Sequence, residues 1–296
     1  AYPTELNAEK IGGAIITELC RYMPSEILIC PAMLDFKDVT AYIKQHTSAL
    51  VELREDACFK DGVMESTMAD QFGPTWRDAL GYEKDALVPY AVAATINYLH
   101  ETQKHGVERI KTVQNYADAQ YMRLSPVTRA NLELTETMRG REKRGTLLWV
   151  LDKTETSMGK RLLRSWIEQP LVDAEAINRR LSAVQALYTA NMARADLKDA
   201  LSHVFDIERL TTRILYGSAT PREVKALGDT CAMLPEVRAQ AAACGAPLLK
   251  DLADQIDPLE DILNKITTAL VEDPPATLKD GGAIRAGYNS EVDELR

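Results

Sequence analysis

Apolar residues recur along the chain either in the pattern of a β-strand or in the pattern of an α-helix. Both patterns occur in the first part of the chain. Residues 27–30 form a continuous apolar run, whereas Val51 and Leu53 alternate with charged residues. Both patterns are typical of β-strands, the first of a strand buried on both faces. Residues 38–46, which lie between them, have a helical pattern. A strand, a helix and a strand in this order predict a right-handed crossover and a parallel sheet.

The remaining sequence has mainly helical periodicity. A helix capped by Asn7 is expected to end near residue 23, and a second extends from residue 85 towards residue 105. Tyr121 and Met122 are a candidate for one short strand. Further helices are expected near residues 131–134, 173–188, 207–217, 220–235 and 259–270.

The expected helix at residue 220 has a strong start signal. Thr220 and Glu223 form a capping box, with Pro221 at the first helical position. Pro235 is expected to interrupt this helix, because proline lacks the backbone N–H that an interior turn needs. The next helix, near residues 259–270, is expected to end at Pro274-Pro275.

Residues 277–288 are predicted to form a short hairpin that turns at Asp280-Gly281-Gly282. Asn289 or Ser290 can cap the helix that follows. The chain stops at Arg296 with no helix-ending signal, so we expect it to be cut inside this helix.

Residues 145–171, GTLLWVLDKTETSMGKRLLRSWIEQPL, contain the clearest single helix. It should begin near Ser157, behind several side chains that can cap it, and end before Pro170. Its apolar residues recur on one face, which predicts that Met158, Leu162 and Trp166 anchor it in a core. Gly159 is expected to allow close helix packing.

Composition limits the classes of protein to consider. A length of 296 residues suits two domains, no apolar run is long enough to cross a bilayer, and the start lacks the features of a signal peptide. The five cysteines form no CxxC pair, which favours reduced thiols and a cytoplasmic location. The net charge of −9 argues against a surface that binds nucleic acid throughout. Residues 1–107 are the more acidic part, with 9 basic and 16 acidic side chains.

A series of motifs runs in one order through most of the chain. It begins with Arg129-Ala130-Asn131-Leu132-Glu133-Leu134, and a structural signature follows, made of Asp152, Thr154, Thr156, Met158, Gly159, Leu162, Trp166 and Pro170. It continues through Asp206-Ile207-Glu208-Arg209, Pro221-Arg222-Glu223, Pro274-Pro275 and Gly287-Tyr288-Asn289. With these motifs the chain resembles the bacterial MutS DNA mismatch repair proteins over nearly its whole length.

The resemblance implies a multi-domain protein in which an α/β part precedes an all-α part. Residues 1–107 would be a ribonuclease-H-like connector domain with parallel strands and missing N-terminal strands. Residues 108–296 would be a mostly helical core domain that includes the start of a lever helix.

The resemblance also implies a role. The chain would be the structural and allosteric middle region of a mismatch repair ATPase, linking mismatch recognition and the DNA clamp to the ATPase. The full-length protein would bind double-stranded mismatched DNA, ATP and Mg²⁺, form a homodimer, act with the partner MutL and require no membrane. For this chain alone we expect no cofactor, no metal and no enzymatic activity.

Two motifs of the full-length family are not found in this sequence. The family reads mismatches with Phe-x-Glu, and none of the four phenylalanines, Phe36, Phe59, Phe72 and Phe205, is followed at that spacing by Glu. A phosphate-binding loop needs GxxxxGK[ST], but the Gly159-Lys160 pair has Thr154 and Arg161 at the other two positions. We therefore predict that the chain alone neither hydrolyses ATP nor prefers mismatched DNA.

Residues 139–164 are locally basic, with eight basic and three acidic side chains. They could make a weak contact with the DNA backbone through Arg141, Lys143, Arg144, Lys160 and Arg164. A solvated helix face with a mobile loop explains the same charges, and this second interpretation is preferred.

Two other classes of protein are compatible with parts of the sequence. A helical protein-interaction scaffold unrelated to repair would also suit an acidic surface without catalytic motifs. A nuclease would need carboxylates that hold two metal ions. The candidates Asp35, Asp38, Asp56 and Asp61 lie in loops or at element ends, where acidic residues are usually only solvated. His100 and His105 would point to different helix faces, which disfavours a metal pair.

Overall fold

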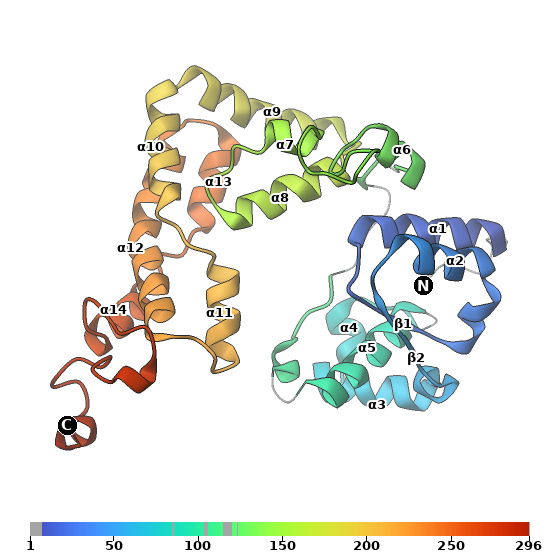
Figure 1. The fold of residues 1–296 in the computed structure, drawn as a ribbon, viewed down its shortest axis with the longest axis horizontal. Coiled ribbons are helices and arrows are strands. Elements are labelled where there is room, and N and C mark those ends of the chain that lie inside the picture. Colours follow the sequence, from blue (N-terminus) through green and yellow to red (C-terminus); the bar gives the residue numbers. More distant parts are fainter. Residues whose placement is uncertain (1–7, 85, 104–105, 115–119, 123, 296) are drawn as a thin grey trace. The chain divides into compact units, whose positions relative to one another are not determined.

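The computed structural model describes residues 8–84, 86–103, 106–114, 120–122 and 124–295 (Figure 1). The chain divides into two compact units. The first comprises residues 1–118 and 124–132, and the second comprises residues 119–123 and 133–296. The domain boundary at residue 107 stays a prediction. Among the described residues, no helix is both long and apolar enough to span a membrane.

The first unit contains the predicted parallel pair of strands. Helix α1 (Ala8–Tyr22) precedes β1 (Glu26–Ile29), and α2 (Lys37–His46) connects β1 to β2 (Leu50–Leu53). The strands pair in parallel from Glu26 opposite Leu50 to Ile29 opposite Leu53. The prediction of a parallel sheet with a helical crossover is confirmed. The predicted cap Asn7 lies outside the described residues.

Further helices and 3-10 turns complete the first unit. Its elements are η1 (Pro31–Asp35), η2 (Asp56–Phe59), α3 (Asp61–Phe72), α4 (Trp76–Leu80), α5 (Val88–Thr102), η3 (Val107–Arg109) and α6 (Pro126–Asn131). Met64 and Met68 of α3 pack with Trp76 and Ala93 in a buried core. The sequence did not predict α3, and α6 begins earlier than the helix expected at residues 131–134.

The second unit is almost entirely helical. Its elements are α7 (Leu147–Leu151), α8 (Ser157–Glu168), α9 (Ala174–Thr189), α10 (Asn191–Ser202), α11 (Ile207–Leu215), α12 (Pro221–Ala243), α13 (Pro247–Gln255), α14 (Glu260–Ala269), η5 (Leu278–Asp280) and α15 (Ser290–Glu294). The long helix α12 packs against α10, α11, α13 and α14 (Figure 1). Leu227 and Cys231 of α12 form a buried core with Leu210 of α11 and Ile266 of α14. The expected order, an α/β part followed by a mostly helical part, is confirmed.

Helix α12 confirms its predicted start and corrects its predicted end. The Thr220–Glu223 capping box is present, with Pro221 in the first turn. Pro235, however, lies inside the helix, which continues to Ala243. The proline ring is on the exposed side, and the turns beyond it bury Val237 and Ala241. Burial of these turns, where α12 packs against α13, outweighs the loss of one helical hydrogen bond.

The predicted hairpin at residues 277–288 is wrong. This segment pairs instead with the residues that follow α14, through an antiparallel bridge between Leu270 and Ile284. The Asp280 carboxylate caps the Thr277 amide at 3.1 Å, and the 3-10 turn that it closes replaces the expected strand. Helix α14 ends at Ala269, before the two prolines that were expected to end it. Tyr121 forms an isolated antiparallel bridge with Leu171, which is the only strand-like pairing found at the predicted short strand within the described residues.

Candidate functional site

Helices α7 and α8 each start at a threonine cap. The Thr146 hydroxyl accepts a hydrogen bond from the Trp149 amide at 3.1 Å, and the Thr156 hydroxyl accepts one from the Gly159 amide at 3.0 Å. Such caps satisfy amides that have no partner inside the helix. Helix α8 ends at Glu168, before Pro170, so both predicted ends of this helix are confirmed.

Asp152 fixes the turn between α7 and α8. One carboxylate oxygen accepts hydrogen bonds from the Thr154 hydroxyl at 2.7 Å and the Thr154 amide at 3.3 Å, and the other pairs with the Lys160 ammonium at 2.8 Å. Lys160, and after it the Thr154 hydroxyl, lower the pKa of Asp152 from 3.8 to about 2. The carboxylate is therefore charged at neutral pH and holds the turn from both sides.

Gly159 serves the cap of its own helix. A Cβ atom built on it would lie 3.0 Å from the Thr156 hydroxyl oxygen and 3.6 Å from the Thr154 Cβ. The atoms nearest to that Cβ belong to the turn that precedes α8. The expected role of Gly159 in close packing against another helix stays a prediction.

The predicted burial of the apolar face of α8 is also wrong. None of the residues of this helix is buried; Leu162 is 53% exposed and Trp166 is 40% exposed. The Arg180 guanidinium of α9 lies 3.8 Å from the centre of the Trp166 ring, as a cation–π contact. The indole is therefore held by a cation at the surface and not by an apolar core.

Arg161 connects α8 to the start of α11. Its two terminal nitrogens lie 2.7 and 2.9 Å from the two carboxylate oxygens of Asp206, and one of them lies 2.5 Å from Glu208. Asp206 also caps α11 by accepting a hydrogen bond from the Arg209 amide at 3.3 Å. The pKa of Asp206 is lowered, chiefly by Arg161. A two-pronged guanidinium–carboxylate pair fixes direction as well as distance, so these residues form a defined joint between two helices.

The structure separates the basic residues that were expected to touch DNA. Lys160 is paired with Asp152, and Arg164 is paired with Glu168 at 3.0 Å within the same helix. Arg141, Lys143 and Arg144 are exposed and form no ion pair within the described ranges. In the sequence these five cations belong to one basic stretch. A count of charges does not show which of them are paired with a carboxylate.

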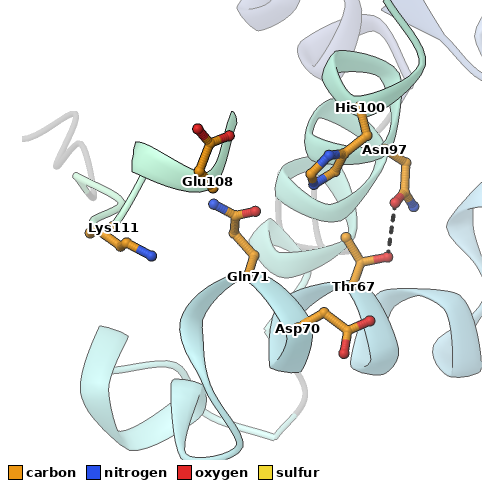
Figure 2. Close-up of a pocket in the computed structure, with 7 residues that line it drawn as sticks. All are labelled: Thr67, Asp70, Gln71, Asn97, His100, Glu108 and Lys111. Atoms are coloured by element: carbon orange, nitrogen blue, oxygen red, sulfur yellow. Dashed lines mark hydrogen bonds between the residues drawn. The ribbon is translucent and has the colours of Figure 1, made fainter. Parts of the chain in front are cut away.

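A polar pocket of about 270 Å³ lies in the first unit, between α3, α5 and η3 with the segment that follows it (Figure 2). It is lined by Thr67, Asp70, Gln71, Asn97, His100, Glu108 and Lys111. The buried Gln71 side chain donates hydrogen bonds to the carbonyl oxygens of Val107 and Ile110, both at 2.8 Å, which fixes that segment against α3. No sequence motif indicated this pocket, because its residues are far apart along the chain.

The carboxylates considered for a nuclease are dispersed over several elements. Asp35 ends η1, Asp38 is in the first turn of α2, Asp56 begins η2 and Asp61 begins α3. Within the part of the chain that the structure describes, no group of three or more His, Cys, Asp or Glu residues could hold a metal ion. His105, the second member of the histidine pair, lies outside the described residues.

The Gly159-Lys160 pair does not fit a nucleotide phosphate. The Gly159 amide is bound to the Thr156 hydroxyl, and the Lys160 ammonium is paired with Asp152. A phosphate-binding loop needs such amides and such a lysine to face its ligand. Neither the Gly159 amide nor the Lys160 ammonium is therefore available to hold a phosphate.

Comparison with known proteins identifies the family. A family model described as MutS domain II matches residues 13–113, and one described as MutS domain III matches residues 127–296. The DNA mismatch repair protein MutS of Ruminiclostridium cellulolyticum is 38% identical over 100% of this chain and 33% of its own length. The protein of the same name from Pelotomaculum thermopropionicum is 39% identical over 95% of this chain and 33% of its own length.

The α/β unit followed by a helical unit thus corresponds to two consecutive domains of a DNA repair protein. The chain belongs to the MutS family, and the resemblance drawn from its motifs is confirmed. It spans about a third of the length of the curated relatives that it matches.

Proposed function

We propose that this chain is the structural and allosteric middle region of a DNA mismatch repair ATPase. The observation that carries the proposal is the joint of Arg161 with Asp206 and Glu208, which ties α8 to α11 through charged hydrogen bonds. Coupling between distant sites is carried by packed, stiff elements with defined arrangements. A joint of this kind allows two helices to move as one body.

The complete protein supplies the sites that this region would connect. We infer that it binds double-stranded mismatched DNA, hydrolyses ATP with Mg²⁺, forms a homodimer, acts with MutL and works in the cytoplasm. Support comes from the relatives, which carry the name DNA mismatch repair protein MutS. These activities are assigned to the complete protein and not to the domain II and domain III residues alone.

The joint can be tested in the full-length protein with Arg161→Ala. We expect mismatch affinity and basal ATP turnover to stay near wild type, while the change in turnover caused by mismatched DNA is largely lost. Couplings between sites are typically worth about 1–3 kcal/mol, or about 5- to 150-fold, so the loss is measurable. The measurement is steady-state ATP turnover with and without saturating mismatched duplex.

Arg164→Ala is the matched control. It removes one cation from the same helix, but its partner Glu168 lies within α8, so no joint between helices is broken. In Arg164→Ala, the change in ATP turnover caused by mismatched DNA should stay at the wild-type size. A folded Arg161→Ala protein with wild-type coupling would contradict the proposal. That result would show that the DNA-induced change in ATP turnover does not depend on the joint of Arg161 with Asp206 and Glu208.

A further inference from the structure

The strongest unpaired positive charge of the second unit lies in residues 139–144, which we call the basic loop. Four of its six residues are basic, Arg139, Arg141, Lys143 and Arg144, and Glu142 is its one acidic residue. All are exposed, and none of the four cations forms an ion pair within the described ranges. The loop is therefore locally positive in a chain with a net charge of −9.

The backbone of the basic loop is held in place by Thr137. The Thr137 hydroxyl donates to the Arg139 carbonyl at 2.8 Å and accepts from the Glu142 amide at 3.0 Å. The Thr137 amide donates to the Glu142 carbonyl at 3.0 Å. These bonds close the loop at its base. The sequence favoured a mobile loop here, whereas the structure shows one with its own hydrogen-bond network.

Thr146 holds the other end of the loop. Its side chain is 1% exposed, and its hydroxyl donates to the Lys143 carbonyl at 2.8 Å. A ligand that binds the four cations therefore meets a backbone that is already ordered. Preorganisation of this kind reduces the entropy lost on binding.

An exposed aromatic ring adjoins the loop. Trp149 is 51% exposed, and the Arg144 guanidinium lies 6.0 Å from the centre of its ring. The ring limits the directions in which this cation can point. The loop thus presents four exposed cations on an ordered backbone, and the position of one of them, Arg144, is restricted.

From this geometry we propose that the basic loop is a binding site for the phosphate backbone of duplex DNA. Guanidinium groups match phosphate oxygens in two-pronged hydrogen bonds, and clustered cations displace the counterions of DNA. The choice of DNA among polyanions rests on the proposed function in mismatch repair. The site is independent of base sequence, because phosphate contacts position a protein without reading bases.

The test measures binding of this 296-residue chain to a labelled, perfectly paired duplex by fluorescence anisotropy over a series of salt concentrations. A variant carries Arg139→Gln, Arg141→Gln, Lys143→Gln and Arg144→Gln. For the wild type we expect log K to fall linearly with log salt. For the variant the slope should become shallower by about 0.9 for each phosphate that the protein no longer neutralises.

The matched control removes four cations that are each paired with a carboxylate in the second unit, through Lys160→Gln, Arg164→Gln, Arg179→Gln and Lys198→Gln. It changes the net charge equally and should keep the wild-type slope. Circular dichroism and thermal melting verify that both variants fold.

Three outcomes would overturn the proposal: no salt-dependent binding by the wild type, equal slopes for both variants, or competition by polyglutamate as strong as by duplex. The last would indicate an acidic protein surface as the ligand. Failure here is distinct from failure of the proposed coupling role. At saturating mismatched DNA, the basic-loop variant of the full-length protein should retain the DNA-induced change in ATP turnover that Arg161→Ala loses.

Discussion

At the scale of single residues, Gly228 sets the distance between α12 and α14. A Cβ atom at this position would lie 2.8 Å from the Ile266 Cγ2 atom, closer than real contacts allow. Both residues are buried. We therefore expect Gly228→Ala to lower the free energy of unfolding by about 1–3 kcal/mol through overpacking. Urea denaturation followed by circular dichroism measures the change.

Gly13 provides the comparison for this substitution. It lies in α1, and a Cβ atom there would meet no atom within 4 Å. Gly13→Ala should stabilise the protein by about 0.4–1 kcal/mol, because alanine has less freedom in the unfolded chain.

The double variant Gly228→Ala with Ile266→Ala should lose less stability than the two single changes combined, since the clashing methyl group is gone. Simple additivity would refute the clash.

Thr230 is a second residue whose contribution to stability can be isolated, because it depends on the side-chain hydroxyl. It is fully buried in α12, and its hydroxyl accepts a hydrogen bond from the Phe205 amide at 3.1 Å while donating to the Ala226 carbonyl at 2.9 Å. Thr230→Val keeps the shape but leaves this amide without its acceptor, which should cost about 1–3 kcal/mol. Thr230→Ser retains the hydroxyl and should keep the Phe205 amide protected in hydrogen exchange. Equal loss of amide protection in both variants would rule out this role.

At the scale of elements, local signals predicted both the starts and the ends of most of the helices that were expected, and the end of α12 is the clearest exception. The helix starts near residues 157 and 173, the cap Asn289 and the Thr220 capping box could be predicted, because each signal acts within four residues along the chain. The parallel pair β1–β2 followed from its apolar pattern. The continuation of α12 through Pro235 could not be predicted, because it depends on packing against a helix that the sequence did not reveal.

The sequence did not predict the contacts that make up the candidate site. Arg161 and Asp206 are separated by 45 residues, so their pairing cannot be read from local charge patterns. The exposure of Leu162 and Trp166 could not be predicted either, because helical periodicity identifies an apolar face without identifying what covers it. Burial is a property of the tertiary structure.

The turn between α7 and α8 should respond to acid. The pKa of Asp152 is lowered to about 2 in the folded state by Lys160 and Thr154, whereas an unfolded Asp has a pKa of about 3.9. A lowered folded-state pKa contributes stability that is complete above about pH 4 and is lost as the pH falls towards about 2. The unfolding free energy of the wild type should therefore fall in this window more steeply than that of Asp152→Asn. Denaturant titrations at several pH values measure both slopes, and parallel curves would contradict this role of the carboxylate.

At the scale of the whole chain, each unit has a hydrophobic core of its own. Met64, Met68 and Trp76 belong to the core of the first unit, and Leu227 and Ile266 belong to that of the second. Stability can therefore differ between the two units, since cooperative opening follows local packing. A substitution in one core should not lower the stability of the other.

Met68→Ala tests this independence. The side chain is fully buried, so its truncation should cost about 2–5 kcal/mol in the first unit. Leu227→Ala is the reciprocal variant for the second unit. Hydrogen exchange measured by mass spectrometry should show that Met68→Ala reduces protection in α3 and α5 while leaving α12 and α14 unchanged, and that Leu227→Ala does the reverse. If either variant lowered protection equally in both units, the chain would unfold as a single cooperative body, and the rigidity proposed for the Arg161 joint would then have to extend through the whole chain.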